Sequence, residues 1–121
     1  MNVFLFIAPV ISVSLSHDHN CVLASTLDNR LRLFDRNTGE LLNEYKGHLN
    51  KQYKIQSRFT YSDEKVVSGS EDGGVYIWDL VESEKMEVLK SHTMTSSCID
   101  CHPRENILIS GSVDGTINLW Q

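Results

Sequence analysis

The sequence is poor in proline and cysteine, and it carries no acceptor site for N-glycosylation. Its 121 residues include two prolines and three cysteines, and no asparagine begins an Asn-x-Ser/Thr triplet. An odd number of cysteines and a missing acceptor site do not fit a secreted domain held by disulfides. We therefore expect a reducing compartment, the cytoplasm and also the nucleus.

Long apolar runs are missing as well. The most apolar stretch, residues 3–8, is far shorter than the roughly 18 residues that a membrane-spanning helix needs. It has no basic region before it and no small-x-small cleavage site, so it does not resemble a signal peptide. An extra strand and the product of a mis-called first exon both remain open for it. We treat residues 1–8 as an apolar N-terminal extension.

The charge balance argues against direct binding of nucleic acid. The formal net charge is −5 and the sequence pI is about 5.4. Binding to phosphates depends on clustered lysine and arginine, and no basic stripe is visible. The hydrophobic content of 40% is too high for a disordered chain. We expect the partners to be other proteins, with neither nucleic acid nor a membrane among them.

A short pattern occurs three times along the chain. In each copy a small apolar strand precedes a tight turn with an aspartate, and an aromatic residue stands six positions after that aspartate. The spacings between copies are 44 and 42 residues. The aspartates and their aromatics are Asp28 with Phe34, Asp72 with Trp78, and Asp114 with Trp120.

A period of about 40–45 residues with Gly-His and Trp-Asp marks resembles the blades of WD40 β-propellers. The pattern predicts an all-β fold of about three four-stranded antiparallel blades, with the last one lacking its outer strand d. The expected bounds are 9–46 for blade 1, 47–90 for blade 2 and 91–121 for blade 3. Because a propeller closes with about 4–8 blades, we expect these blades to be an incomplete part of a larger ring. A small open stack of sheets is the alternative.

Alternation and turn residues place the strands within each blade. No amphipathic helix is evident. The expected strands are 10–16, 21–25, a strand through Leu31 and Leu33, and 41–45 in blade 1; 53–60, 65–68, 75–78 and 86–89 in blade 2; and 97–101, 107–110 and 116–120 in blade 3.

Polar residues recur at fixed places in blades 2 and 3. In WD40 blades such residues form a structural hydrogen-bond relay from a loop histidine through the turn aspartate and a strand serine to the indole N–H. Unpaired, these buried groups would cost about 1–3 kcal/mol each. Blade 1 has no histidine in place, so its relay is absent or starts before the chain does. The expected relay residues are His48, Ser68, Ser70, Asp72 and Trp78, and His92, Ser110, Ser112, Asp114 and Trp120.

The same residue types could suggest a Ser-His-Asp hydrolase. However, Gly69 to Gly73 is not a Gly-x-Ser-x-Gly elbow, and no strand-to-helix turn surrounds it. Repetition of the cluster suits a structural role better than a single catalytic site. We expect no enzymatic activity and no catalytic residue.

Two further patterns suggest cofactors at first sight. Cys98 to His102 matches Cys-x-x-Cys-His, which attaches c-type haem. It falls on an expected strand, and further zinc ligands at a suitable spacing are not obvious. His17 and His19 flank an aspartate in a polar turn, where solvation is the ordinary state. We expect no cofactor and no metal.

The loop between blades 1 and 2 is long and polar and contains one aromatic residue. In propellers the d–a loops (between strand d of one blade and strand a of the next) and the b–c turns form a top rim, where recognition residues collect on a rigid scaffold. The candidate partner-contact residues on this rim are Asn50, Lys51, Tyr53, Glu71 and Gly73.

A more specific likeness covers residues 9–81. The run from Leu27 to His48, followed by Tyr53-Lys54-Ile55 and Val66 to Val81, resembles the mitogen-activated protein kinase organiser type of WD40 protein. The resemblance implies a seven-bladed ring, no catalytic residue, and a scaffold that gathers kinase-pathway components by protein–protein interaction. The alternative is a structural subunit of a spliceosomal or other RNA-processing complex.

Overall fold

The computed structural model describes residues 8–90 and 92–121, and within them the chain is built from strands alone. The expected extension at residues 1–8 lies outside the described residues except for Ala8. No helix in the described part could cross a membrane. The strands are β1 (Val10–Leu15), β2 (Cys21–Thr26), β3 (Arg30–Asp35), β4 (Leu41–Lys46), β5 (Ser57–Phe59), β6 (Lys65–Ser68), β7 (Gly74–Asp79), β8 (Met86–Lys90), β9 (Ser96–Cys101), β10 (Leu108–Ser112) and β11 (Ile117–Trp120).

The strands form three antiparallel sheets in chain order. Two sheets have four strands, in the orders β1-β2-β3-β4 and β5-β6-β7-β8, and the third has three, in the order β9-β10-β11. Each sheet is a meander of neighbouring hairpins, and the strands of each lie within one expected blade. The all-β prediction of three blades, the last with three strands, is confirmed for the described residues. We call the sheets blades 1, 2 and 3.

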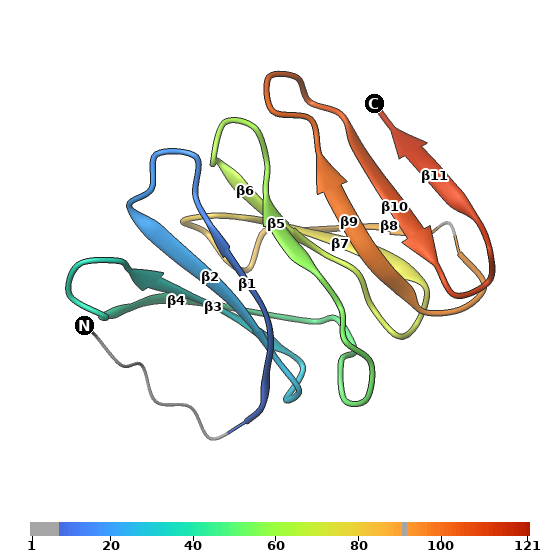
Figure 1. Cartoon of the computed structure of the whole chain (residues 1–121), viewed down its shortest axis with the longest axis horizontal. Helices are drawn as coiled ribbons and strands as arrows, with labels where there is room; N and C mark the ends of the chain where they lie inside the picture. The colour runs from blue at the N-terminus through green and yellow to red at the C-terminus, as the bar shows by residue number, and fades with distance from the viewer. Residues whose placement is uncertain (1–7, 91) are drawn as a thin grey trace.

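The first strands of the blades lie side by side (Figure 1). β5 contacts β1 on one side and β9 on the other. We call this row of β1, β5 and β9 the hub. The Ser57 N–H of β5 reaches Ser12 Oγ of β1 at 3.4 Å, and the N–H of Gln56, just before β5, reaches the Ser97 carbonyl of β9 at 3.1 Å. The blades fan out from the hub.

One strand is shorter than predicted. Residues 53–60 were expected to form the first strand of blade 2, but β5 begins at Ser57. The N–H groups of residues 51–53 point to the Glu71 carboxylate, and that of Gln56 points to blade 3. These backbone groups are therefore satisfied outside the sheet, and no ladder forms before Ser57.

The core lies between the blades, so blade 2 is apolar on both faces. One cluster includes Leu31 and Leu33 of blade 1 with Val66 and Trp78 of blade 2. A second cluster, Val67, Val75, Ile99 and Leu108, joins blades 2 and 3. Adjacent residues on a strand point to opposite faces. This is why Val66 and Val67 are both fully buried, whereas β3 alternates apolar residues with arginines.

Glycine allows two b–c turns to close and one of them to pack tightly. Gly73 and Gly115 hold the same place after the turn aspartate, and both have φ +89°. A Cβ on Gly73 would lie 2.3 Å from the carbonyl oxygen of His92, whereas one on Gly115 would meet nothing within 4 Å. The turn of blade 2 is therefore pressed against the loop that enters blade 3.

This difference leads to a prediction for alanine variants. Gly115→Ala is expected to lower the free energy of unfolding by about 1–2 kcal/mol, the cost of a left-handed residue with a side chain. Gly73→Ala adds a backbone clash and is expected to cost on the order of 1–3 kcal/mol more. Urea denaturation of both variants measures the difference. Equal losses would contradict the close approach of blades 2 and 3.

Candidate functional site

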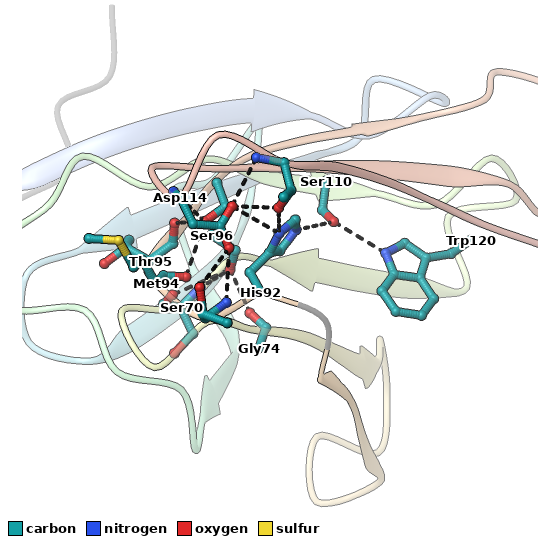
Figure 2. Close-up of polar contacts among 12 residues, drawn as sticks. Ser70, Gly74, His92, Met94, Thr95, Ser96, Ser110, Asp114 and Trp120 are labelled. Carbon is teal, nitrogen blue, oxygen red and sulfur yellow. Dashed lines mark hydrogen bonds and ion pairs between the residues drawn. The ribbon is translucent and has the colours of Figure 1, made fainter.

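The three turn aspartates occupy equivalent places, and each is paired differently. In blade 3 the structure brings the relay residues together (Figure 2). Trp120 Nε1 lies 3.2 Å from Ser110 Oγ, which lies 2.8 Å from His92 Nε2. His92 Nδ1 lies 2.7 Å from Thr116 Oγ1, and the Thr116 hydroxyl donates to the Asp114 carboxylate. Thr116, which the sequence analysis missed, stands between the histidine and the aspartate.

The chemistry of the two ends sets the direction of this relay. An indole N–H can only donate, and an ionised carboxylate can only accept. Ser110 therefore accepts from Trp120 and donates to His92, and His92 carries its proton on Nδ1 and donates to Thr116. The Thr116 hydroxyl and the Thr93 N–H, 2.9 Å from Oδ2, bond to Asp114 and hold the pKa of that carboxyl well below its usual range.

Blade 2 differs from the predicted relay. Trp78 Nε1 donates to the carbonyl of Lys46 at 2.9 Å, and Ser68 Oγ donates to the carbonyl of Gly69 at 2.8 Å. Neither ring nitrogen of His48 has a hydrogen-bond partner among the described residues. The ring of His48, only 4% exposed, packs edge-on against Trp78 with 5.1 Å between centroids. His48 is thus a packing residue here.

One sequence difference accounts for this arrangement. The place of Thr116 is taken in blade 2 by Gly74, so the hydroxyl that would join His48 to Asp72 is missing. Tyr76 occupies the vacant space, 3.0 Å from where a Gly74 Cβ would stand, and its hydroxyl donates to Asp72. Burial and this bond raise the pKa of Tyr76 to about 12.

In blade 1 the partner of the turn aspartate is an arginine. Arg32 stands four residues after Asp28, as Tyr76 stands after Asp72. Its Nη2 lies 2.8 Å from Asp28 Oδ2, its Nη1 lies 2.7 Å from Thr26 Oγ1, and its Nε lies 3.2 Å from Glu44. Burial raises the pKa of Asp28, but the bonds from Arg32 and Thr26 outweigh it and the net shift is downward.

The remaining serines fasten the turns to neighbouring loops. Ser70 Oγ accepts from the N–H of Leu49 at 3.0 Å, and Ser112 Oγ donates to the carbonyl of Thr95 at 2.9 Å. Both hydroxyls also accept the N–H of the turn aspartate two residues later. Ser70 and Ser112 therefore bond to backbone groups of the turns and loops and not to a tryptophan.

A Ser-His-Asp constellation does exist in blade 3, and its surroundings explain why it is structural. Ser110 is 1% exposed and His92 is 8% exposed. The Ser110 oxygen already accepts the Trp120 N–H, and Thr116 separates His92 from Asp114, whose Oδ1 lies 3.9 Å from Nδ1. A substrate carbonyl could not approach this hydroxyl.

On the rim, Glu71 organises the loop between blades 1 and 2. Its Oε2 accepts the backbone N–H groups of Lys51, Gln52 and Tyr53 at 2.9, 2.7 and 2.9 Å. Burial raises the pKa of Glu71, but the three N–H groups lower it by more. Lys51 and Tyr53 remain exposed on a loop that is fixed through its backbone.

Two of the expected rim residues are buried, so they do not lie on the exposed surface of the rim in this structure. Asn50 is 0% exposed, and its side-chain amide has no hydrogen-bond partner within the described part. Its backbone exchanges hydrogen bonds with Asn29 of blade 1. Gly73 is also buried, against His92. The exposed rim is therefore Lys51 and Tyr53, with Glu71 half-buried beneath them.

The cysteine motif lies on β9. Cys98 and Cys101 are three apart on a strand, so their side chains leave opposite faces of the sheet. All three cysteines are free, and burial raises the pKa of the Cys101 thiol to about 11. His17 Nδ1 lies 2.7 Å from Asp63 and so links the a–b turns of blades 1 and 2. The described residues contain no group of three or more histidine, cysteine or acidic side chains placed to hold a metal.

Three repeated meanders, joined at a hub and pinned by their b–c turns, define a propeller-type repeat protein. The model of the WD domain, G-beta repeat, matches residues 5–35, 39–79 and 83–121. The chain therefore belongs to the WD40 repeat family. The matched repeats are offset from the sheets, because the second and third each take strand d of one blade and strands a to c of the next.

Named relatives cover almost the whole chain. WD repeat domain-containing protein 83 of Danio rerio is 42% identical over 113 residues, which are 93% of this chain and 36% of that protein. The human protein of that name is 40% identical over 94% of this chain and 36% of its own length. The Dictyostelium discoideum homolog is 40% identical over 93% and 34%. The chain spans about a third of the length of these curated relatives.

The two histidines are expected to respond differently to phenylalanine. His92→Phe should lower the free energy of unfolding by about 1–3 kcal/mol, because Ser110 and Thr116 each lose a buried partner. His48→Phe should be neutral or stabilising, because that ring packs on Trp78 without hydrogen bonds. Urea denaturation of the matched pair tests this, and an equal cost at both sites would contradict the different roles.

The buried His48 also predicts a pH dependence. Burial lowers its pKa from 6.5 to about 4. Between these values the unfolded chain binds a proton that the folded chain excludes, so stability falls as the pH drops from about 6.5 to about 4 and His48 contributes no further loss below that. The full loss is on the order of 3 kcal/mol. Urea titrations at several pH values should show a shallower slope in His48→Phe, and an unchanged slope would contradict the assignment.

Proposed function

We propose that the chain is part of a non-catalytic scaffold that binds proteins through its rim and acts in mitogen-activated protein kinase signalling. The observation that carries this proposal is the rim loop, whose exposed Lys51 and Tyr53 are held by the Glu71 carboxylate through three backbone bonds. Binding on a loop fixed in advance costs little ordering entropy. Membership of the WD40 family and the likeness to the organiser type support the same reading.

The scaffold works by holding two or more pathway components at once. Docking of one component raises the effective concentration of the next, so their reaction becomes intramolecular. The partners are protein components of the kinase cascade. The net charge of −5 disfavours direct contact with nucleic acid. Three free cysteines suit a reducing location, the cytoplasm and also the nucleus.

Affinity capture with variants tests the proposal. The unmodified chain is expected to enrich kinase-cascade proteins, and Tyr53→Ala is expected to reduce that enrichment about tenfold, because truncation of an aromatic anchor removes more than about 1 kcal/mol of binding. Quantitative mass spectrometry of the captured proteins measures it. Val81→Ala is the control, since Val81 is 80% exposed in the c–d turn at the other end of blade 2.

Two outcomes would contradict the proposal. Enrichment of splicing factors in place of kinases, with the same dependence on Tyr53, would assign the chain to an RNA-processing complex. Equal effects of Tyr53→Ala and Val81→Ala on kinase capture would remove the rim as the binding surface.

A further inference from the structure

A pocket of about 410 Å³ opens at the hub, between blades 1 and 2. Its walls are the start of β1 on one side and, on the other, β5 with the residues just before it. Lys54, Gln56 and Arg58 line the blade 2 side, and Val10 and Val13 line the blade 1 side. The pocket is separate from Tyr53 and Glu71, which do not line it.

All the charged side chains that line this pocket are cations, in a chain whose net charge is negative. The arginines of blade 1 are paired, because Arg30 and Arg32 both contact Glu44. Lys54 and Arg58 form no ion pair within residues 8–90 and 92–121. Their charge is therefore available to a ligand.

The backbone fixes the direction of Arg58. Residues 54, 56 and 58 alternate with Ile55, Ser57 and Phe59, which are 0%, 0% and 3% exposed. Within β5, Ser57 and Phe59 face the core, so Arg58 between them leaves the opposite face of the strand. Lys54 and Gln56 precede β5 and line the same pocket. One Arg58 Nη1–H is used on the carbonyl of Ser57 at 3.1 Å. The other N–H groups of the guanidinium have the planar geometry that binds a carboxylate with two parallel bonds.

We propose that this pocket binds acidic side chains of an extended segment of a partner protein. Arg58 holds one carboxylate and Lys54 adds a second positive charge. Gln56, whose Oε1 accepts the N–H of Ile99 at 3.4 Å, donates to the same carboxylate through its Nε2. Val10 and Val13 are 43% and 64% exposed and cover the methylene groups of the acidic side chain. The proposal rests on the proposed function only in that the occupant is a protein.

Charge favours an acidic peptide over a nucleic acid as the occupant. A nucleic acid needs a basic groove that follows many phosphates. This pocket offers two cations, and the chain as a whole carries a net charge of −5, which disfavours a long polyanion. A short acidic segment places its charge where the cations are.

Fluorescence anisotropy with a defined peptide tests the site. The full chain is titrated into a labelled peptide of glutamates flanked by glycines, and a peptide with glutamine in place of glutamate is the matched control. We expect the glutamate peptide to bind at least about tenfold more tightly, and higher salt to weaken it. Arg58→Gln and Lys54→Gln should each lower its affinity, with the larger loss of about tenfold at Arg58.

Arg104→Gln is the control for loss of charge alone, because Arg104 is exposed in the a–b turn of blade 3. Lys54 is exposed too, so Lys54→Gln is not expected to unfold the chain, and circular dichroism checks both pocket variants. Equal binding of the two peptides, equal effects of Arg104→Gln and Lys54→Gln, or tighter binding of a single-stranded oligonucleotide at the same salt would overturn the proposal. Loss of peptide binding with kinase capture retained would separate this site from the rim.

Discussion

The structure depends on the pairing of one carboxylate in the tight b–c turn of each blade. The three aspartates are not fully buried, but each bonds to backbone N–H groups or side chains that hold the turn in place. Blade 1 supplies an arginine, blade 2 a tyrosine, and blade 3 a histidine relay that acts through Thr116. Because each solution also ties the turn to a strand, the aspartate fixes the turn, and the turn fixes the neighbouring loop.

The positions of the three aspartates, and so the three blades, could be predicted from the sequence because the turn and the alternating strands are local features. The partners of the aspartates could not be predicted in this way. They depend on the residues two and four positions further on, where Gly74 replaces Thr116 and Tyr76 matches Arg32. The Gly-His pair at His48 suggested the complete relay in blade 2, yet the sequence of blade 3, without that glycine, forms it. Because Gly74 has no hydroxyl to join His48 to Asp72, the relay does not form in blade 2, even though the Gly-His pair is present there.

Burial of the loop residues was equally hard to predict. Asn50 looks like a contact residue because it is polar and lies in a long loop, but the loop folds back so that its backbone can bond to Asn29. Lys51 and Tyr53 stay outside because their N–H groups, and not their side chains, satisfy Glu71. One carboxylate therefore decides which side chains of the loop a partner can reach. A Glu71→Gln change would keep the side-chain shape but weaken three charge-assisted bonds at once.

Both sides of blade 2 combine apolar packing with hydrogen bonds, and the groups that make those bonds differ. Toward blade 3, Ser70, Gly74 and Ser96 exchange short polar bonds, and glycine allows the backbones to meet. Toward blade 1, hydrogen bonds from Trp78 to the Lys46 carbonyl and from Tyr45 to the Leu80 carbonyl accompany an aromatic and aliphatic contact. His48 is buried in that contact without a hydrogen-bond partner among the described residues. An unpaired buried imidazole lowers stability, so His48 weakens this junction. The hub pocket opens at this same junction, where a bound carboxylate beside Arg58 would bridge blades 1 and 2. Occupancy of the pocket would then reinforce the packing that His48 weakens.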